Sequence, residues 1–319
     1  MVTYYCKNTK ELTQKELNQM ADLFSRVWER DIEVDFLISQ YTNNPFGFSY
    51  HSLAKDDDII IGFSSYVPAW FVYGEQKYVF VCGLDTMIDK RHRDGFVFYD
   101  VIKNAHSYMK EKGVVMNYGY PNDNSCPVLL KTKLTKQIGK MHTYCLPYRI
   151  GGLKKGLKLA NCLSMLGSCL WVMLCSVFAS KEVHFFYIHK DEESYNLSRY
   201  KRYGGDYGYA QLKNGEFHYR IKEHEGVRTA FILDVSPKSS RNYVDAVKFL
   251  IKNNSKVFDL VLYPGELPFG VTGMIKLPRK IEPKNFNMTG NILDKKKLDE
   301  KYIYDIRNWD TNLSNYDLI

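Results

Sequence analysis

A basic turn between an apolar run and a helical pattern is the first place in the sequence where chemistry is expected. The apolar run VFVCGL covers residues 79–84, and the turn RHRDG follows at 91–95. Backbone N–H groups of such a turn, together with the N-terminus of the next helix, can bind a phosphate group. An ordinary strand-to-helix connection uses the same residue types, so both interpretations stay open.

Polar side chains near this turn could move protons or hold a ligand. Asp85 follows the apolar run directly, where a carboxylate could accept a proton from an amine, although a turn or N-cap role fits equally well. Asn122 and Asn124 follow the next apolar run, VVMNYGY at 114–120. Capping of a helix by Asn124 or Ser125 is the simpler expectation there, and a hydrogen bond to a ligand is the alternative.

The cysteine and histidine content argues against disulfide bonds and a structural metal. The seven cysteines are an odd number without a C-x-x-C pair, which is typical of reduced thiols in the cytoplasm. The eight histidines form no H-E-x-x-H motif or paired His/Cys cluster, so no metal is expected. Cys126 follows the polar turn, and we interpret it as a buried, inert thiol rather than a nucleophile.

The length, composition and charge of the chain limit the classes of protein to which it can belong. The 319 residues are enough for two domains with a core each, and 45% hydrophobic residues exclude a disordered chain. The net charge of +8 allows a polyanionic partner such as an anionic bilayer or a phosphorylated cofactor. The basic residues are dispersed and form no nucleic-acid-binding motif, so no nucleic acid is expected as a partner.

Apolar periodicity predicts a mixed α+β arrangement in the first half of the chain. Thr13 and Glu16 have the spacing of a capping box, which places the start of a helix there. A three-strand antiparallel meander is then followed by a helix and an apolar strand. The expected elements are strands 2–6, 48–56, 59–73, 78–88 and 114–120, helices 33–41, 95–112 and 125–133, and a strand pair near 137–148.

The second half repeats this order of elements, which indicates a duplicated unit. A meander is again followed by a helix and then an apolar strand. The predicted elements are strands 182–189, 206–213, 216–223, 227–235 and 256–265, with helices 191–203 and 239–253. The sequence therefore predicts an N-terminal domain at 1–150, an apolar linker helix at 151–181 and a C-terminal domain at 182–319.

An uncharged segment at 159–179 connects the two halves. It is flanked by Lys154, Lys155, Lys158 and Lys181, and its length matches the ~20 residues that cross a bilayer. A buried interdomain helix, a helix in the membrane interface and a true span are the three interpretations. A span would put the halves on opposite sides of a membrane, so we favour burial or membrane-surface contact.

Three stretches of the first half resemble GNAT-fold acyltransferases. NPFGFSYHSLAKDDDIIIGFSSY at 44–66 is similar to the family's strand pair and its turn. The stretch at 87–113 occupies the place of the acyl-CoA loop. VVMNYGYPNDNSCPVLLKTKLTKQIG at 114–139, the most specific, is similar to the end of such domains in sugar-modifying and envelope-polysaccharide enzymes. Over 182–319 the resemblance rests on element order, with a degenerate second domain.

The resemblance implies a fold and a chemistry. In this family, two neighbouring strands splay apart to admit the pantetheine arm, and the loop amides with the helix N-terminus hold the CoA pyrophosphate. A strand amide polarises the thioester carbonyl, an amine attacks, and a carboxylate or water takes its proton, often with a Tyr protonating the thiolate. Acetyl-CoA is therefore the expected co-substrate.

The family loop R-x-x-G-x-G/A can be matched position by position. His92 stands at the Arg position, Gly95 matches the first Gly, and Val97 replaces the second small residue. Leu130 stands near the family's Tyr, so other tyrosines are the candidate acids. The resemblance implies catalytic roles for Asp85, Tyr118 and Tyr144, and cofactor binding by Met87, Ile88, His92, Arg93, Asp94, Gly95, Phe96, Val97, Asn122 and Asn124.

Three functions are consistent with these observations. The first is an acyl-CoA-dependent N-acyltransferase that acetylates the amine of an amino sugar or a cell-envelope polysaccharide precursor, in the cytoplasm or at a membrane surface. The second is a GNAT-like binding or scaffold protein without activity. The third is a peptidoglycan-type aminoacyltransferase, which would take its donor from aminoacyl-tRNA.

Overall fold

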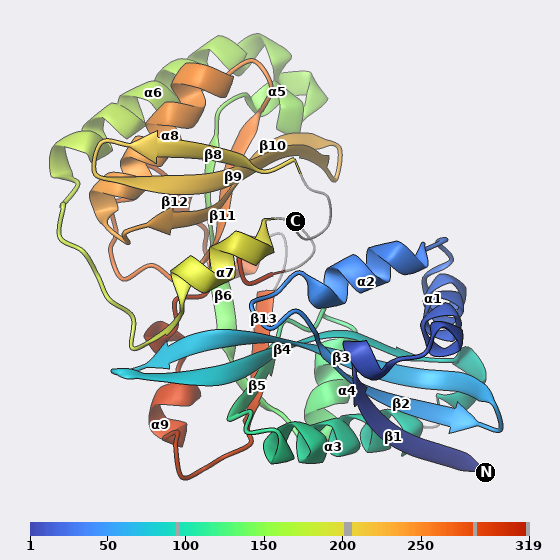
Figure 1. The fold of residues 1–319 in the computed structure, drawn as a ribbon. Helices are drawn as coiled ribbons and strands as arrows, with labels where there is room; N and C mark the ends of the chain where they lie inside the picture. Colours follow the sequence, from blue (N-terminus) through green and yellow to red (C-terminus); the bar gives the residue numbers. More distant parts are fainter. Residues whose placement is uncertain (94–95, 201–205, 283–285, 317–319) are drawn as a thin grey trace. The chain divides into compact units, whose positions relative to one another are not determined.

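The computed structural model describes the chain except for residues 94–95, 201–205, 283–285 and 317–319 (Figure 1). The chain forms two compact units. Unit 1 comprises residues 1–139, 187–205 and 287–308, and unit 2 comprises residues 140–186, 206–286 and 309–319. The chain therefore passes between the units several times, unlike the sequential domains 1–150 and 182–319 expected from the sequence.

The sheet of unit 1 has the strand order β1-β2-β3-β4-β5-β13. Neighbouring strands from β1 to β4 are antiparallel, β4 and β5 are parallel, and β13 is antiparallel to β5. The short strand β7 pairs with β3. The strands are β1 (Val2–Asn8), β2 (Tyr50–Asp56), β3 (Ile59–Tyr73), β4 (Gln76–Ile88), β5 (Met116–Gly119), β7 (Ile188–Lys190) and β13 (Phe286–Ile292).

Helices cover both faces of this sheet. Figure 1 shows α1 (Gln14–Trp28) and α2 (Val34–Thr42) on one face and α3 (Phe96–Glu111) on the other. Thr13 and Glu16 form the predicted capping box at the start of α1. The shorter helices are α4 (Ser125–Lys131), α7 (Glu192–Arg199) and α9 (Glu300–Ile303), with 3-10 turns at Thr9–Glu11, Lys90–His92 and Ile306–Asn308.

Unit 2 contains the strand order β6-β11-β10-β9-β8, with β12 paired to β6. Its helix α8 follows the meander β8-β9-β10 and precedes β11, which is parallel to β10. The same order links β2-β3-β4, α3 and β5 in unit 1, as the sequence predicts. The elements are β6 (Lys136–Pro147), β8 (Gly208–Leu212), β9 (Gly215–His224), β10 (Val227–Ser236), β11 (Leu260–Gly265), β12 (Ile275–Lys276), α5 (Ile150–Leu153), α6 (Asn161–Phe178) and α8 (Ser240–Asn254), with 3-10 turns at Lys155–Ala160 and Arg279–Ile281.

Two predicted elements differ from the structure. The strand pair expected near 137–148 is the single strand β6, which starts in unit 1 and continues into unit 2. The strand expected at 182–189 is reduced to β7 at its end. Residues before β7 are held instead by hydrogen bonds to the start of α8, from the Arg241 N–H to the Ser180 carbonyl and from the His184 N–H to the Lys238 carbonyl.

Candidate active site

The parallel pairing of β4 and β5 is short. It runs from Phe80 opposite Met116 to Gly83 opposite Gly119, where β5 ends. β4 continues to Ile88, and among the described residues its strand partner there is β3. A Cβ atom on Gly119 would lie 3.3 Å from the Gly83 carbonyl oxygen, so a side chain here would crowd the neighbouring strand. We call this point, where the pairing of the two strands ends, the β4–β5 divergence.

A β-bulge lies at the divergence. Ser64 pairs with Thr86 and Tyr66 pairs with Gly83, so two residues of β4 oppose the single Ser65. Bulges redirect side chains and are common beside active sites. Asp85, one of the two extra residues, accepts hydrogen bonds from Gln40 Nε2 at 2.6 Å and from the Tyr41 hydroxyl at 3.0 Å.

A buried histidine lies behind the residues that hold Asp85. The Tyr41 ring meets the His51 ring edge-on, with 4.7 Å between the ring centroids. His51 is hydrogen-bonded to Thr9 Oγ1 and Ser65 Oγ, both at 2.9 Å. Burial lowers the pKa of His51 to about 3, so the ring is neutral and fixes Tyr41 without adding charge. This network is not predictable from the sequence, because its members are far apart in the chain.

The structure separates the predicted catalytic tyrosines. Tyr118 lies on β5 opposite Cys82, three residues before Asp85 in the register of β4, and its buried ring packs edge-on against Phe71. Tyr144 lies on β6 within unit 2 and is also buried. Burial raises the pKa of Tyr144 above its usual value, and the nearby Glu266 carboxylate adds to the effect. Asp85 and Tyr118 therefore share a sheet, and Tyr144 belongs to the other unit.

Asp89 organises the loop that follows β4. Its Oδ1 atom accepts a hydrogen bond from the Arg91 N–H at 3.0 Å, and its carbonyl accepts one from the His92 N–H at 2.9 Å. The backbone hydrogen bond from Arg91 holds the pKa of Asp89 below its usual value. Two loop amides are thus already paired, which the sequence analysis missed. Asp94 and Gly95, predicted to bind the cofactor, lie outside the described residues.

The other loop side chains place positive charge at the surface. The side chain of Arg91 is 82% exposed, and Arg93 is exposed with its Nε donating to the Ile88 carbonyl at 3.0 Å. His92 Nε2 lies 3.8 Å from an oxygen of Asp56. Phe96, the first residue of α3, is 75% exposed. This arrangement suits an anionic group with an apolar part.

Three of the predicted cofactor residues are core residues. Met87 packs in the cluster beneath α1 and α2, and Ile88 packs with Val97 in the cluster beneath α3. Val97 Cγ1 would lie 3.3 Å from a Cβ atom on Gly62, so this side chain points at the sheet. The bulky Val97 in place of a small loop residue therefore fills the core under α3, and only the backbones of these residues could reach a ligand.

The polar turn after β5 caps a helix. Asn122 Oδ1 accepts hydrogen bonds from the Asn124 N–H at 3.1 Å and the Ser125 N–H at 2.8 Å, which caps α4. Asn124 is the N-cap residue of α4, within the pair predicted from the sequence, but its side chain makes no cap hydrogen bond. An upstream Asn spans the turn and reaches two amides, whereas Asn124 adopts helical backbone angles. Cys126 is buried.

The corresponding junction of unit 2, between β10 and α8, is closed by ion pairs. Lys238 Nζ contacts Asp234 Oδ1 and lies 3.3 Å from Asp310 Oδ2, and all three side chains are buried. Asn312 Nδ2 donates to Asp234 at 3.0 Å, and the Ser314 N–H donates to the Leu233 carbonyl at 3.2 Å. Residues near the end of the chain therefore occupy the edge of β10 at this junction.

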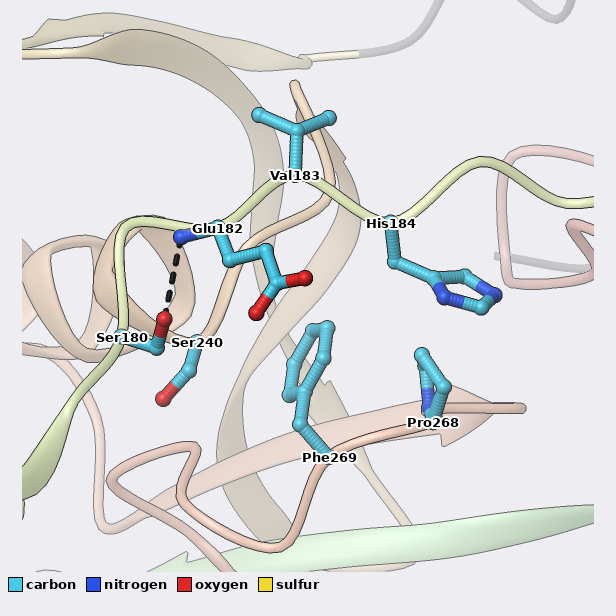
Figure 2. Close-up of a pocket in the computed structure, with 7 residues that line it drawn as sticks. All are labelled: Ser180, Glu182, Val183, His184, Ser240, Pro268 and Phe269. Carbon is cyan, nitrogen blue, oxygen red and sulfur yellow. Dashed lines mark hydrogen bonds between the residues drawn. The ribbon is translucent and has the colours of Figure 1, made fainter.

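A cavity of about 200 Å³ lies in unit 2 beside the start of α8. Figure 2 shows Glu182, His184 and Phe269 among the residues that surround it. The Glu182 carboxylate disfavours an anionic ligand in this position. The predicted site residues do not line this cavity. Among the described residues, no group of three or more His, Cys, Asp or Glu side chains could hold a metal ion.

Comparison with known proteins identifies the fold. No family model and no curated protein sequence matches the chain. A GCN5-related N-acetyltransferase from Anabaena variabilis is similar, with a TM-score of 0.58 and 12% identity over 91% of this chain and 73% of that chain. Another from Kribbella flavida has a TM-score of 0.53 and 10% identity, over 92% of this chain and 72% of that chain.

A third structure supports the same assignment. A probable N-acyltransferase from Enterococcus faecalis has a TM-score of 0.57 and 11% identity, over 91% of this chain and 73% of that chain. At these identities the likeness defines the fold. The chain has the mixed α+β fold of GCN5-related (GNAT) N-acetyltransferases, which confirms the fold class predicted from the sequence.

Proposed function

We propose that the protein is an acyl-CoA-dependent N-acyltransferase that acetylates the amine of an amino sugar or of a cell-envelope polysaccharide precursor. The observation that carries the proposal is the β4–β5 divergence at Gly83 and Gly119, because β4 continues beyond its pairing with β5 and leads into a basic loop. The GNAT fold supports the choice of acyl-CoA as donor.

Binding of the diphosphate would rely on the later part of the loop. Asp89 already pairs the amides of Arg91 and His92, so these two N–H groups are not available. The helix α3 begins at Phe96, and the N–H groups in the first turn of a helix point out of its end. Together with the cations of Arg91 and Arg93, this N-terminus would hold a negatively charged group.

The acyl transfer requires a proton acceptor and a proton donor. The amine nitrogen forms the new N–C bond, the C–S bond of the thioester breaks, and the sulfur leaves as a thiolate. We assign the role of proton acceptor to Asp85, and the hydrogen bonds by which Gln40 and Tyr41 hold its carboxylate beside the divergence support this assignment. Tyr118, which pairs with Cys82 of β4, is the candidate donor to the thiolate.

A binding protein without catalytic activity is the second candidate function. The two amides occupied by Asp89 favour it, because they are lost to a phosphate ligand. In either case the protein would bind CoA only if the part of the loop after His92 binds the diphosphate. They differ in whether free CoA thiol is released in the presence of an amine.

Thiol release from acetyl-CoA, measured with a panel of amino sugars and other primary amines, tests the proposal. We expect Asp85→Asn to lower kcat by at least ~100-fold, in the range typical of a lost general base, with CoA affinity unchanged. Asp58→Asn is the matched control, because the Asp58 side chain is 86% exposed in a turn. Absence of amine-dependent thiol release would reject the proposal, and absence of CoA binding as well would favour the protein without activity.

A further inference from the structure

The helix α6 (Asn161–Phe178) presents a wide apolar face to solvent. Eight large apolar side chains point outward, and Leu163, Val177 and Phe178 are each about 70% exposed. Cys162, Gly167 and Cys169 complete this face, which carries no charged residue. The eight side chains are Leu163, Leu166, Leu170, Trp171, Met173, Leu174, Val177 and Phe178. An exposed apolar surface of this kind marks a binding site.

The polar residues of α6 face the protein instead of the solvent. Asn161 Oδ1 accepts a hydrogen bond from the Gly151 N–H at 2.7 Å. Ser164 Oγ donates to the Tyr148 carbonyl at 3.0 Å, and Ser168 Oγ donates to the Pro147 carbonyl at 2.9 Å. Ser176 is bonded to the Val172 carbonyl within the helix. The polarity of α6 is therefore the reverse of that of a surface helix in water.

The attachment of α6 along its length is incompatible with a membrane span. By length and hydropathy the segment Gly156–Phe178 could cross a bilayer, and 17% of its apolar stretch is buried. Ser164 and Ser168 fix its first half to the end of β6, and Val172 and Cys175 pack in the core of unit 2. The chain returns to α8 immediately after the helix. Both ends therefore lie on one folded unit.

Lysines flank the apolar face at both ends. Lys154 and Lys158 precede α6 and Lys181 follows it, and all three are exposed. Cations at the rim of an apolar helix face match anionic lipid headgroups, while their stems can lie along the apolar surface. A second copy of the chain would bring the same cations together in an antiparallel pairing, which opposes dimerisation through this face.

We propose that α6 docks unit 2 on an anionic lipid bilayer, with the helix lying in the interface and its outward face among the acyl chains. The reversed polarity and the flanking lysines carry this inference together. It does not depend on the proposed acyltransferase activity.

Sedimentation with vesicles of equal parts phosphatidylglycerol and phosphatidylcholine tests the proposal. We expect the full chain to bind, and Leu170→Glu/Leu174→Glu to lower the partition coefficient at least ~10-fold, because charged residues replace apolar area in the interface. The matched control is Ile59→Glu/Val128→Glu, which changes two apolar residues exposed by 59% and 51% in unit 1. Far-ultraviolet circular dichroism should be unchanged in both variants. Equal binding of the two variants would overturn the proposal.

The lysines and the depth of insertion are tested separately. Lys154→Glu/Lys158→Glu/Lys181→Glu should weaken binding to the anionic vesicles at least ~10-fold and leave binding to pure phosphatidylcholine unchanged. Carbonate at high pH should release the bound protein, and resistance to release would contradict an interfacial helix. A dimer in solution that Leu170→Glu/Leu174→Glu dissociates would assign the face to a second copy and also overturn the proposal.

Discussion

The two strand-to-helix junctions of the molecule have the same order of elements and opposite chemistry. In unit 1, β4 continues beyond its pairing with β5, and the following loop carries Arg91 and Arg93 at the surface. In unit 2, the end of β10 is covered by residues near the end of the chain, and Lys238 is buried between two carboxylates. The arginines of the first junction are exposed, although Arg91 Nε also lies 3.4 Å from Asp89, whereas the lysine of the second junction is buried and paired.

This difference explains why element order alone does not locate a site. A parallel strand pair with a helix between its strands provides a place where backbone groups become accessible. Whether a ligand can use it depends on side chains from other parts of the chain. Asp89 lies within the loop of unit 1 and pairs only two amides, whereas Asp310 and Asn312 reach the junction of unit 2 from far along the chain.

Removing the buried cation of unit 2 should have the largest effect. Lys238→Met leaves Asp234 and Asp310 buried without their ammonium partner, which typically costs about 3–5 kcal/mol of unfolding free energy. Arg93→Met in the loop of unit 1 should cost less than about 1 kcal/mol, because Arg93 is exposed. Thermal unfolding of both variants measures the two losses of stability. Equal losses would contradict the contrast between the two junctions.

The buried titratable groups of the two units should change the free energy of unfolding in opposite directions as pH rises. Burial raises the pKa of Glu266 in unit 2 to about 7, and its Oε1 atom has no hydrogen-bond partner among the described residues. Because the folded state binds this proton more tightly than the unfolded chain, stability falls as pH rises from about 4.5 to about 7. Glu266→Gln should remove this fall, which amounts to about 3 kcal/mol.

The buried histidine His106 of unit 1 should make the free energy of unfolding rise with pH. Burial lowers the pKa of His106 to about 4, and Asn117 and Asn291 surround its ring nitrogens. The unfolded chain takes up this proton near pH 6.5, so the stabilising contribution is present above that pH and lost as pH falls toward 4. Unfolding followed between pH 4 and pH 8 in the wild type and Glu266→Gln separates the two effects. A Glu266→Gln variant with the wild-type pH profile would contradict the assignment.

Reversing the charge of the loop should weaken ligand binding. Arg91→Glu/Arg93→Glu removes two cations from the N-terminal side of α3, and we expect CoA affinity to fall at least ~10-fold, or about 1.4 kcal/mol. Lys110→Glu/Lys112→Glu makes the same charge change with exposed residues at the other end of α3. Calorimetry measures both, and equal losses would indicate a long-range charge effect rather than contact.

The smallest expected effect concerns helix caps in the two units. Asn122→Ala removes the cap of α4, and Ser239→Ala removes the side chain that accepts from the Asn242 N–H in α8. Each should cost about 1 kcal/mol. Asn124→Ala is the control, because its side chain makes no cap hydrogen bond. Denaturant unfolding compares the three, and a cost for Asn124→Ala equal to that of Asn122→Ala would reject this assignment.

Local patterns in the sequence predicted the elements well. The capping box of Thr13 and Glu16, the strand at 59–73 and the helix after Ser239 all follow from periodicity and short-range hydrogen bonds. The site was only partly predictable. Asp85 was a candidate from its place after an apolar run, but only the tertiary fold brings Gln40 and Tyr41 to it and His51 to Tyr41.

The errors have the same physical origin. The strand expected at 182–189 is apolar enough to pair, yet its first residues bond to the start of α8, which lies about fifty positions later in the sequence. Tyr144 has the right chemistry for a proton donor, but β6 carries it into unit 2. Long-range pairing decides such cases, and periodicity over a short window contains no information about it.

Hydrogen–deuterium exchange with and without CoA tests the central claim most directly, that the divergence in unit 1 binds acyl-CoA and the junction in unit 2 does not. The account predicts slower exchange of the amides at 84–88 and at the start of α3 when CoA is bound, with no change at 232–242. Protection at 232–242, or no protection anywhere at millimolar CoA, would contradict it.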